Sequence, residues 1–120
     1  MAINVSILED VILLTVTGSW DGTQGYEALI KSSEAVKANR IYRLLLDIRQ
    51  AEIETSTLDI YMVTSALAES FPAGTRHAVL QARDESLKSS GNFFETVAAN
   101  RGVMAKTFSD KKEALRWLRA

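Results

Sequence analysis

The chain of 120 residues contains no cysteine, one proline and one histidine. The absence of cysteine excludes disulfide bonds, thiolate metal sites and thiol nucleophiles. Nucleophilic or acid–base catalysis needs an activated nucleophile with an oriented base, and one isolated histidine cannot form that set. We therefore expect a protein that is not an enzyme, and we interpret His77 as a strand-entry residue without a chemical role.

The chain also lacks an excess of charge of either sign and a long hydrophobic run. It has 14 basic and 15 acidic residues, so no global field attracts nucleic acid or an anionic membrane. No segment approaches the roughly 20 apolar residues that span a bilayer, and residues 1–14 lack the basic region of a secretory signal. We expect a cytoplasmic protein with no nucleic-acid partner and no transmembrane segment.

The glycine-rich stretch "GSWDGTQG", residues 18–25, lacks both the Gly-Lys-Ser/Thr ending and the GxGxxG spacing of phosphate-binding loops. Its composition predicts a plain loop, and we expect no cofactor and no metal. Trp20 in this stretch has two interpretations. It covers one end of the core, as tryptophan usually does, or it lines a ligand opening or a partner surface.

Hydrophobic periodicity predicts the elements of the fold. Ile3, Val5 and Ile7 alternate with polar neighbours and predict a first strand, which a Glu9-Asp10 turn joins to a second strand at 11–17. Further strands are expected at 41–48, 76–82 and 103–108, the first of them apolar enough to be buried on both faces. Helices are expected after residue 21, at 57–70, at 84–102 with a break at 89–91, and after Asp110.

The first of these helices has Tyr26, Leu29, Ile30, Ser33 and Val36 at helical spacing, with Asp21 or Thr23 as its cap. The resulting order is ββαβαβαβα. Strands that alternate with helices imply crossover connections, so residues 1–120 form one α/β domain with a mixed, mostly parallel five-strand sheet covered by four helices. The opening hairpin supplies the antiparallel edge.

The element order, "RLLLDIR" as central strand and "TFSDKKEALRWLR" as closing strand and helix resemble the STAS-like group, in particular its SpoIIAA-like branch of small bacterial proteins. The resemblance covers nearly the whole chain. In anti-sigma-factor antagonists of this group, the third strand ends in Asp and leads to an Ile-Asp-Ser-Ser-Gly-Leu segment. A partner kinase phosphorylates the second serine of that segment and thereby controls binding.

Asp47 matches the strand-end Asp, and "IETSTL" at 53–58 matches the segment with a loop one residue shorter. Ser56 falls at the phosphorylated position, while the departures from the pattern are Glu54 for Asp, Thr55 for the first Ser and Thr57 for Gly. The resemblance therefore implies a regulatory module that contacts a protein partner at the start of the second helix. A modified Ser56 is the functional interpretation, and a helix cap alone is the alternative, because Ser56 and Asp59 have capping-box spacing.

A second hypothesis concerns "NFFETVAA", which places Phe93, Phe94, Val97 and Ala98 on one helical face. Ordinary packing against the sheet explains this face. The SpoIIAA-like branch also resembles the lipid-binding lobe of Sec14-like proteins, which implies a small apolar ligand or lipid behind a gate of Phe93, Phe94 and Trp20, hinged at Ser89-Ser90-Gly91. A homodimer is a further open alternative.

Overall fold

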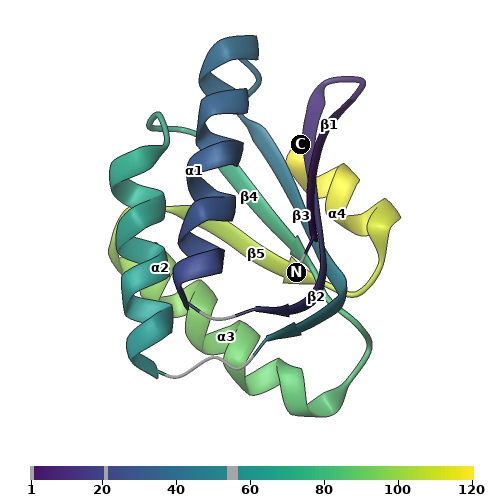
Figure 1. The fold of residues 1–120 in the computed structure, drawn as a ribbon, viewed down its shortest axis with the longest axis vertical. Coiled ribbons are helices and arrows are strands. Elements are labelled where there is room, and N and C mark those ends of the chain that lie inside the picture. The colour runs from purple at the N-terminus through teal and green to yellow at the C-terminus, as the bar shows by residue number, and fades with distance from the viewer. Residues whose placement is uncertain (1, 21, 54–56) are drawn as a thin grey trace.

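The computed structural model describes residues 2–20, 22–53 and 57–120, apart from the side chains of residues 20, 22, 23, 53, 57–59 and 85–87. Strands and helices alternate after an opening hairpin (Figure 1). The elements are β1 (Ala2–Leu8), β2 (Val11–Trp20), α1 (Gly22–Asn39), β3 (Arg43–Ile53), α2 (Thr57–Ser70), β4 (Arg76–Leu80), α3 (Glu85–Asn100), β5 (Met104–Phe108) and α4 (Lys111–Leu118). The predicted ββαβαβαβα order is confirmed.

The five strands form one sheet in the order β1-β2-β3-β4-β5. The β1–β2 pair is antiparallel, and the other three pairs are parallel. Strand order follows chain order, so right-handed crossovers place α1, α2 and α3 on the same face of the sheet. The strand order never reverses among these five strands, and the sheet therefore has no switch-point crevice of the kind that holds ligands in doubly wound folds.

Each face of the sheet buries its own apolar cluster. The larger cluster joins Ile12, Leu14, Val16 and Leu44 to apolar residues of α1, α2 and α3. On the opposite face, Leu45, Ala78 and Leu80 pack against Ala114 and Leu118 of α4. Consecutive strand residues point to opposite faces, so Leu44 and Leu45 enter different clusters. The prediction of a central strand buried on both faces is confirmed.

Several predicted boundaries differ from the structure where neighbouring strands decide them. Gly18, Ser19 and Trp20, expected in a loop, continue β2 because their backbones pair with Ala51, Glu52 and Ile53 of β3. Gly18 adopts a φ of 83°, which glycine tolerates without steric cost. Residues 22–25, expected in the same loop, already belong to α1. Two residues were expected to cap this helix. Asp21 lies outside the described residues, and the side chain of Thr23 also lies outside the description.

The helices also differ from expectation in two details. Tyr26 is exposed rather than buried, because α1 turns its small residues, such as Ala28 and Ser32, toward the sheet. The Ser32 hydroxyl donates to the Leu29 carbonyl of the same helix at 2.9 Å, so its burial leaves the hydroxyl paired. Residues 89–91 lie inside a continuous α3 and do not divide it.

Helix boundaries set by local signals agree with the sequence. The second helix runs over Thr57–Ser70 as predicted and ends just before Pro72. Gly102 has a φ of 74° after α3, the left-handed conformation expected there. Asp110 caps α4, with its side chain accepting from the Lys112 backbone N–H at 3.1 Å.

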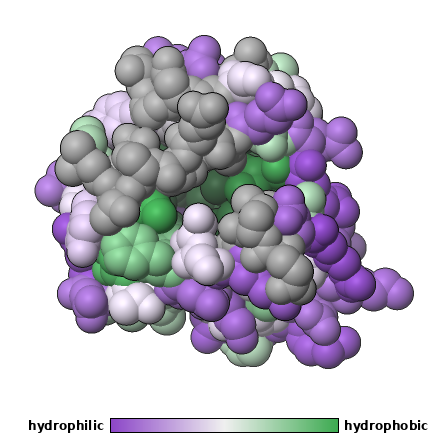
Figure 2. Space-filling model, turned by 90° about the horizontal axis from the view of Figure 1, so that it is seen from below, coloured by the Kyte–Doolittle hydropathy of each residue, from purple (hydrophilic) through white to green (hydrophobic). Residues whose placement is uncertain are grey.

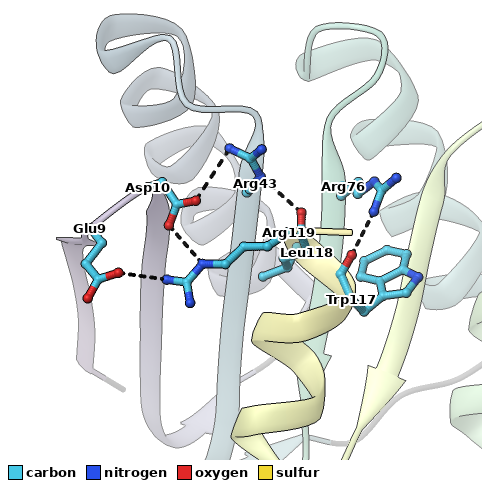
Figure 3. A network of polar contacts seen from close by, with 7 residues as sticks. All are labelled: Glu9, Asp10, Arg43, Arg76, Trp117, Leu118 and Arg119. Carbon is cyan, nitrogen blue, oxygen red and sulfur yellow. Dashed lines mark hydrogen bonds and ion pairs between the residues drawn. The ribbon is translucent and has the colours of Figure 1, made fainter.

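Arginines of β3 and β4, together with Arg119 just after α4, connect the end of α4 to the sheet (Figure 3). The side chains of Arg43 and Arg76 donate to the carbonyls of Leu118 and Trp117 at 3.0 and 2.7 Å. Carbonyls in the last turn of a helix lack the usual i+4 N–H partners, and a cation there is favoured by the helix dipole. The Trp117 carbonyl also accepts from the Ala120 backbone N–H at 3.3 Å. Arg119 then reaches the β1–β2 turn, where it contacts Asp10 at 2.9 Å and Glu9 at 3.3 Å.

Within the described residues, no helix combines the length and the apolar character that a membrane span requires. The same residues contain no group of three or more histidine, aspartate and glutamate side chains placed to hold a metal ion.

Candidate functional site at the start of the second helix

Asp47 is the last residue of β3 that pairs with both neighbouring strands. It lies opposite Thr15 of β2 and Leu80 of β4. After Asp47, β3 carries one extra residue at 48–49 relative to β2 and continues to Ile53 with β2 as its described neighbour. The strand predicted at 41–48 therefore runs five residues further than expected, because pairing with β2 continues to Ile53.

The Asp47 carboxylate is held by Arg49, two residues further along the strand. The Arg49 side chain donates through Nε at 3.0 Å and through Nη2 at 2.9 Å, and its backbone N–H donates at 3.1 Å. The side-chain hydrogen bonds from Arg49 hold the pKa of Asp47 below its usual range. Arg49, the one nearby cation in the sequence, is thus already engaged by this carboxylate.

Beyond Asp47, β3 carries Glu52 on its exposed part. The Ser19 hydroxyl of β2 donates to this carboxylate at 3.2 Å. Glu52 therefore belongs to β3, beyond the predicted strand end at residue 48, and is hydrogen-bonded across the sheet. The strand pair β2–β3 projects past the end of β4 and carries this negative charge toward the start of α2.

The hydroxyl cluster expected to carry the function falls mostly outside the described residues. Glu54, Thr55 and Ser56 lie in the gap between β3 and α2, and Thr57 is the first residue of α2, with its side chain outside the description. In the chain, this segment links the end of β3 to the start of α2. The roles of Ser56 as cap or modified residue stay predictions.

An exposed groove lies along α2 from Tyr61 to Glu69, between α1 and α2. Its volume is about 280 Å³, and we name it the α1–α2 groove after its lining, which consists of Tyr26, Tyr61, Met62, Ser65, Ala66, Glu69 and Arg101. The two tyrosines and Met62 are exposed, and Met62 is 63% accessible to solvent. Figure 2 views the end of the molecule at which α2 begins and shows hydrophobic surface among the described residues, with hydrophilic residues toward the outline of the molecule.

Arg101 organises one wall of this groove. Its Nε donates to the Ser65 hydroxyl at 2.9 Å, and its guanidinium lies 5.2 Å from the centre of the Tyr61 ring. On its other side Tyr61 contacts Phe93 edge-to-face, with ring centres 5.7 Å apart. Sequence reasoning missed this groove because it assigned Tyr26 to the buried face; the adjacent Tyr61-Met62 pair, near the start of a helix, was the available signal.

The two adjacent phenylalanines of α3, Phe93 and Phe94, contact different parts of the molecule. The Phe93 ring contacts the ring of Tyr61 at the α1–α2 groove, whereas Phe94 packs against the larger core cluster. The small residues in front of them do not form a hinge between helices. Gly91 is buried, and a Cβ there would lie 3.0 Å from the Thr107 hydroxyl, so this glycine serves close packing of α3 on β5.

A second hollow of about 410 Å³ lies at the carboxyl ends of β4 and β5. Its lining is mostly polar and comprises Gln81, Ala82, Arg83, Asp84, Lys88, Asn92, Thr107, Phe108 and Ser109. An apolar ligand requires a mostly apolar enclosure with a few polar groups. Neither of these two hollows has that character, since the first is an open surface groove and the second is polar. The gate formed by Phe93, Phe94 and Trp20 stays a prediction.

His77 is buried in β4, at 4% exposure, with its ring edge-on to Phe71 and the ring centres 4.7 Å apart. Its Nδ1 atom has no hydrogen-bond partner among the described residues. Burial lowers the pKa of His77 to about 4, so the ring is neutral at physiological pH. The expected absence of catalysis stays a prediction.

Known structures resemble this chain over almost its whole length. An anti-sigma factor antagonist from Mycobacterium paratuberculosis is 18% identical, with a TM-score of 0.67 over 99% of this chain and 94% of that one. An uncharacterised DUF3478-family protein with a SpoIIAA-like fold from Shewanella loihica is 19% identical, with a TM-score of 0.62 over 98% and 92%.

The anti-sigma factor antagonist SpoIIAA in its unphosphorylated form is 12% identical, with a TM-score of 0.61 over 99% of both chains. No protein-family profile matches the chain, and no curated protein sequence matches it. At identities this low, structural likeness establishes the fold and leaves the activity open. The chain has the SpoIIAA-like (STAS-like) fold that its sequence pattern indicated.

Proposed function

We propose that this protein is a non-catalytic regulatory module that binds a protein partner with the surface around the start of α2. The observation that carries this proposal is the α1–α2 groove, where two tyrosines and a methionine of α1 and α2 are exposed. Aromatic and methionine side chains are enriched in the buried centres of protein interfaces. The similarity to two anti-sigma factor antagonists supports the same interpretation.

Charge in this region favours a basic partner. The α2 sequence contains Asp59 and Glu69 and no lysine or arginine. Arg49 is paired with Asp47, whereas Arg101, which donates to Ser65 and lies over Tyr61, brings one positive charge to the groove. An acidic helix next to an exposed aromatic groove attracts a positively charged surface and excludes acidic ones.

The Ser56 position gives this surface a means of regulation. A phosphate adds nearly two negative charges and is favoured at a helix N-terminus by the dipole and by unpaired backbone N–H groups. Modification there would change the affinity for a partner by electrostatics and leave the buried clusters untouched. The similarity to the antagonist segment in order, though not in every residue, supports this assignment.

The first experiment compares capture of partners from the native host by the wild type and by the Ser56→Ala and Ser56→Asp variants, followed by titration with the purified partner. We expect Ser56→Ala to bind like the wild type and Ser56→Asp to bind differently, with phosphate on Ser56 of protein isolated from cells. If Ser56 only caps α2, Ser56→Ala costs about 1 kcal/mol of stability and Ser56→Asp restores it. Identical partners for all three, without phosphate, would contradict the switch.

A pair of methionines provides a matched control for the groove. Met62 lies in the α1–α2 groove, and Met104 is an exposed methionine of β5 that does not line it. With a basic partner, Met62→Lys should weaken binding at least about tenfold, as expected for an interface anchor, while Met104→Lys should leave it unchanged. Equal effects of the two substitutions would remove the groove from the interface.

The carrier hypothesis is tested separately by native mass spectrometry of protein purified from cells. A bound apolar molecule that survives purification, with no effect of Met62→Lys on any protein contact, would favour a carrier over a regulatory module. A ligand-free mass would count against the gate of Phe93, Phe94 and Trp20.

A further inference from the structure

The outer edge of β1 is an open strand edge with an unusual sequence. β1 runs over seven residues, "AINVSIL", and contains no charged residue and no proline. Among the described elements it contacts β2 and α1. Natural proteins usually protect such edges with charges, prolines, bulges or very short strands, because an open edge pairs readily with another strand. β1 has none of these protections.

The opposite edge of the same sheet, β5, shows the contrast. It has five residues, and one of them is the exposed Lys106. The Glu95 carboxylate of α3 accepts from the Thr107 backbone N–H at 2.6 Å and from its hydroxyl at 3.0 Å. A backbone donor of this edge strand is thus already occupied by a side chain. The two edges differ in their capacity to add a strand, and β1 is the open one.

The hairpin turn determines which backbone groups of β1 face outward. Leu8 and Val11 flank the two-residue turn as a pair, and the carbonyl of the first residue of such a turn accepts from the fourth. Hydrogen-bonded and non-hydrogen-bonded pairs alternate along an antiparallel ladder. The backbone groups of Ala2, Asn4, Ser6 and Leu8 therefore face β2, and those of Ile3, Val5 and Ile7 face the open edge.

The β1 sequence is self-complementary about Val5. When two copies of β1 run antiparallel with Val5 opposite the partner's Val5, Ile3 lies opposite the partner's Ile7, Asn4 opposite the partner's Ser6, and Ala2 opposite the partner's Leu8. In this register every apolar residue lies opposite an apolar residue of the second copy. Asn4 lies opposite the second copy's Ser6 on the sheet face that does not carry Ile3, Val5 and Ile7. The three outward-facing residues are the ones that exchange backbone hydrogen bonds in this register.

From this pattern we propose that β1 pairs with β1 of a second copy of this chain, in the Val5-centred antiparallel register, to form a dimer with one continuous sheet. Such an interface is isologous and closes after two copies. Ile7 is 53% exposed in the single chain, and the partner's Ile3 covers it in the dimer. The proposal is independent of the function proposed for α2.

The helices leave room for this pairing. A two-fold axis normal to the sheet puts both copies of α1 on the same side, and α1 contacts β1, β2 and β3, so it lies above β2. Three strand spacings of about 4.8 Å separate β2 from the partner's β2. The two copies of α1 therefore lie about 14 Å apart, wider than the 8–10 Å of packed helices, and neither blocks the edge.

The test uses the exposed polar pair, because Asn4 and Ser6 point away from the larger cluster. In Asn4→Lys/Ser6→Lys, the Val5-centred register places two lysines directly opposite each other twice across the dimer, which is destabilising. In the matched variant Asn4→Lys/Ser6→Glu, each lysine faces a glutamate of the partner. Both variants change the same two exposed positions of the single chain, and thermal unfolding checks that both fold.

Sedimentation of the full chain without an N-terminal tag, at about 1 to 500 µM, measures the dissociation constant of the dimer. We expect a wild-type dimer, dissociation at least about tenfold easier in the lysine–lysine variant, and dimerisation retained in the lysine–glutamate variant. A monomeric wild type over this range overturns the proposal. So does a dimer that responds equally to both variants, because its contact would then lie elsewhere or in another register.

Discussion

The buried imidazole of His77 makes the stability of this protein depend on pH in a predictable window. The side chain is 4% exposed, makes a T-shaped contact with the Phe71 ring and has an Nδ1 atom without a hydrogen-bond partner among the described residues. Protonation would place a charge in this apolar setting. Burial accordingly lowers the pKa of His77 to about 4, from the usual value of 6.5.

The sign and size of the effect follow from linkage. The folded pKa lies below the unfolded one, so as the pH falls the unfolded chain binds the proton first. The free energy of unfolding is therefore unaffected by His77 above pH 6.5 and decreases as the pH falls from 6.5 toward 4. At about 1.4 kcal/mol per unit of pKa difference, the loss is roughly 2 kcal/mol at pH 5 and about 3 kcal/mol at pH 4.

Urea unfolding of the wild type and of His77→Leu, measured between pH 7.5 and pH 4.5, tests this reasoning. Leucine fills a similar volume and removes the unpaired nitrogen, so at pH 7.5 we expect the variant to lie within about 1.5 kcal/mol of the wild type. Below pH 6.5 the wild type should lose stability and the variant should not. The Asp47 carboxyl, whose pKa is lowered from 3.8, titrates below this window and does not interfere.

Two results would refute the argument. One is an equal decrease of stability with pH in wild type and His77→Leu. The other is an NMR titration in which the imidazole of the folded protein protonates near pH 6.5, because that would show the ring to be solvated or hydrogen-bonded.

Two further predictions concern packing and charge. Gly91→Ala should destabilise the protein by about 1 kcal/mol, despite the higher helix propensity of alanine. The reason is that the new Cβ would contact the Thr107 hydroxyl, which Glu95 holds in place. In a Thr107→Ala background, urea unfolding should show the same change to be neutral or stabilising. Asp47→Asn should lower the free energy of unfolding by no more than about 1 kcal/mol at pH 7. In the wild type, the Asp47 carboxyl should titrate with a pKa below 3.8 by NMR, so its contribution to stability is present at neutral pH and lost in acid. In Arg49→Gln, this pKa should rise toward 3.8. An unchanged Asp47 titration in Arg49→Gln would contradict the ion pair as the cause.

The sequence predicted which strand and helix flank the candidate site, but not which side chains line the groove between α1 and α2. Asp47 on the central strand and the helix beginning at Thr57 both follow from local patterns, and the structure has Asp47 within β3 and Thr57 as the first residue of α2. The α1–α2 groove was not predictable, because it depends on how α1 is rotated about its axis. Tyr26 has the spacing of a buried residue, yet the small residues beside it pack closer to the sheet and leave it exposed.

The sequence by itself determined the order of strands and helices, the hairpin at Glu9-Asp10, the ends of α2 and the cap of α4. These features depend on residues within a few positions of each other, so turn, cap and proline signals suffice to define them. Only the tertiary structure decided that Gly18 to Trp20 form a strand, that Gly91 is a packing residue and that Glu95 covers the edge of β5. Each of these depends on a partner brought close by the sheet, and the backbone and side-chain contacts made there outweigh local propensity.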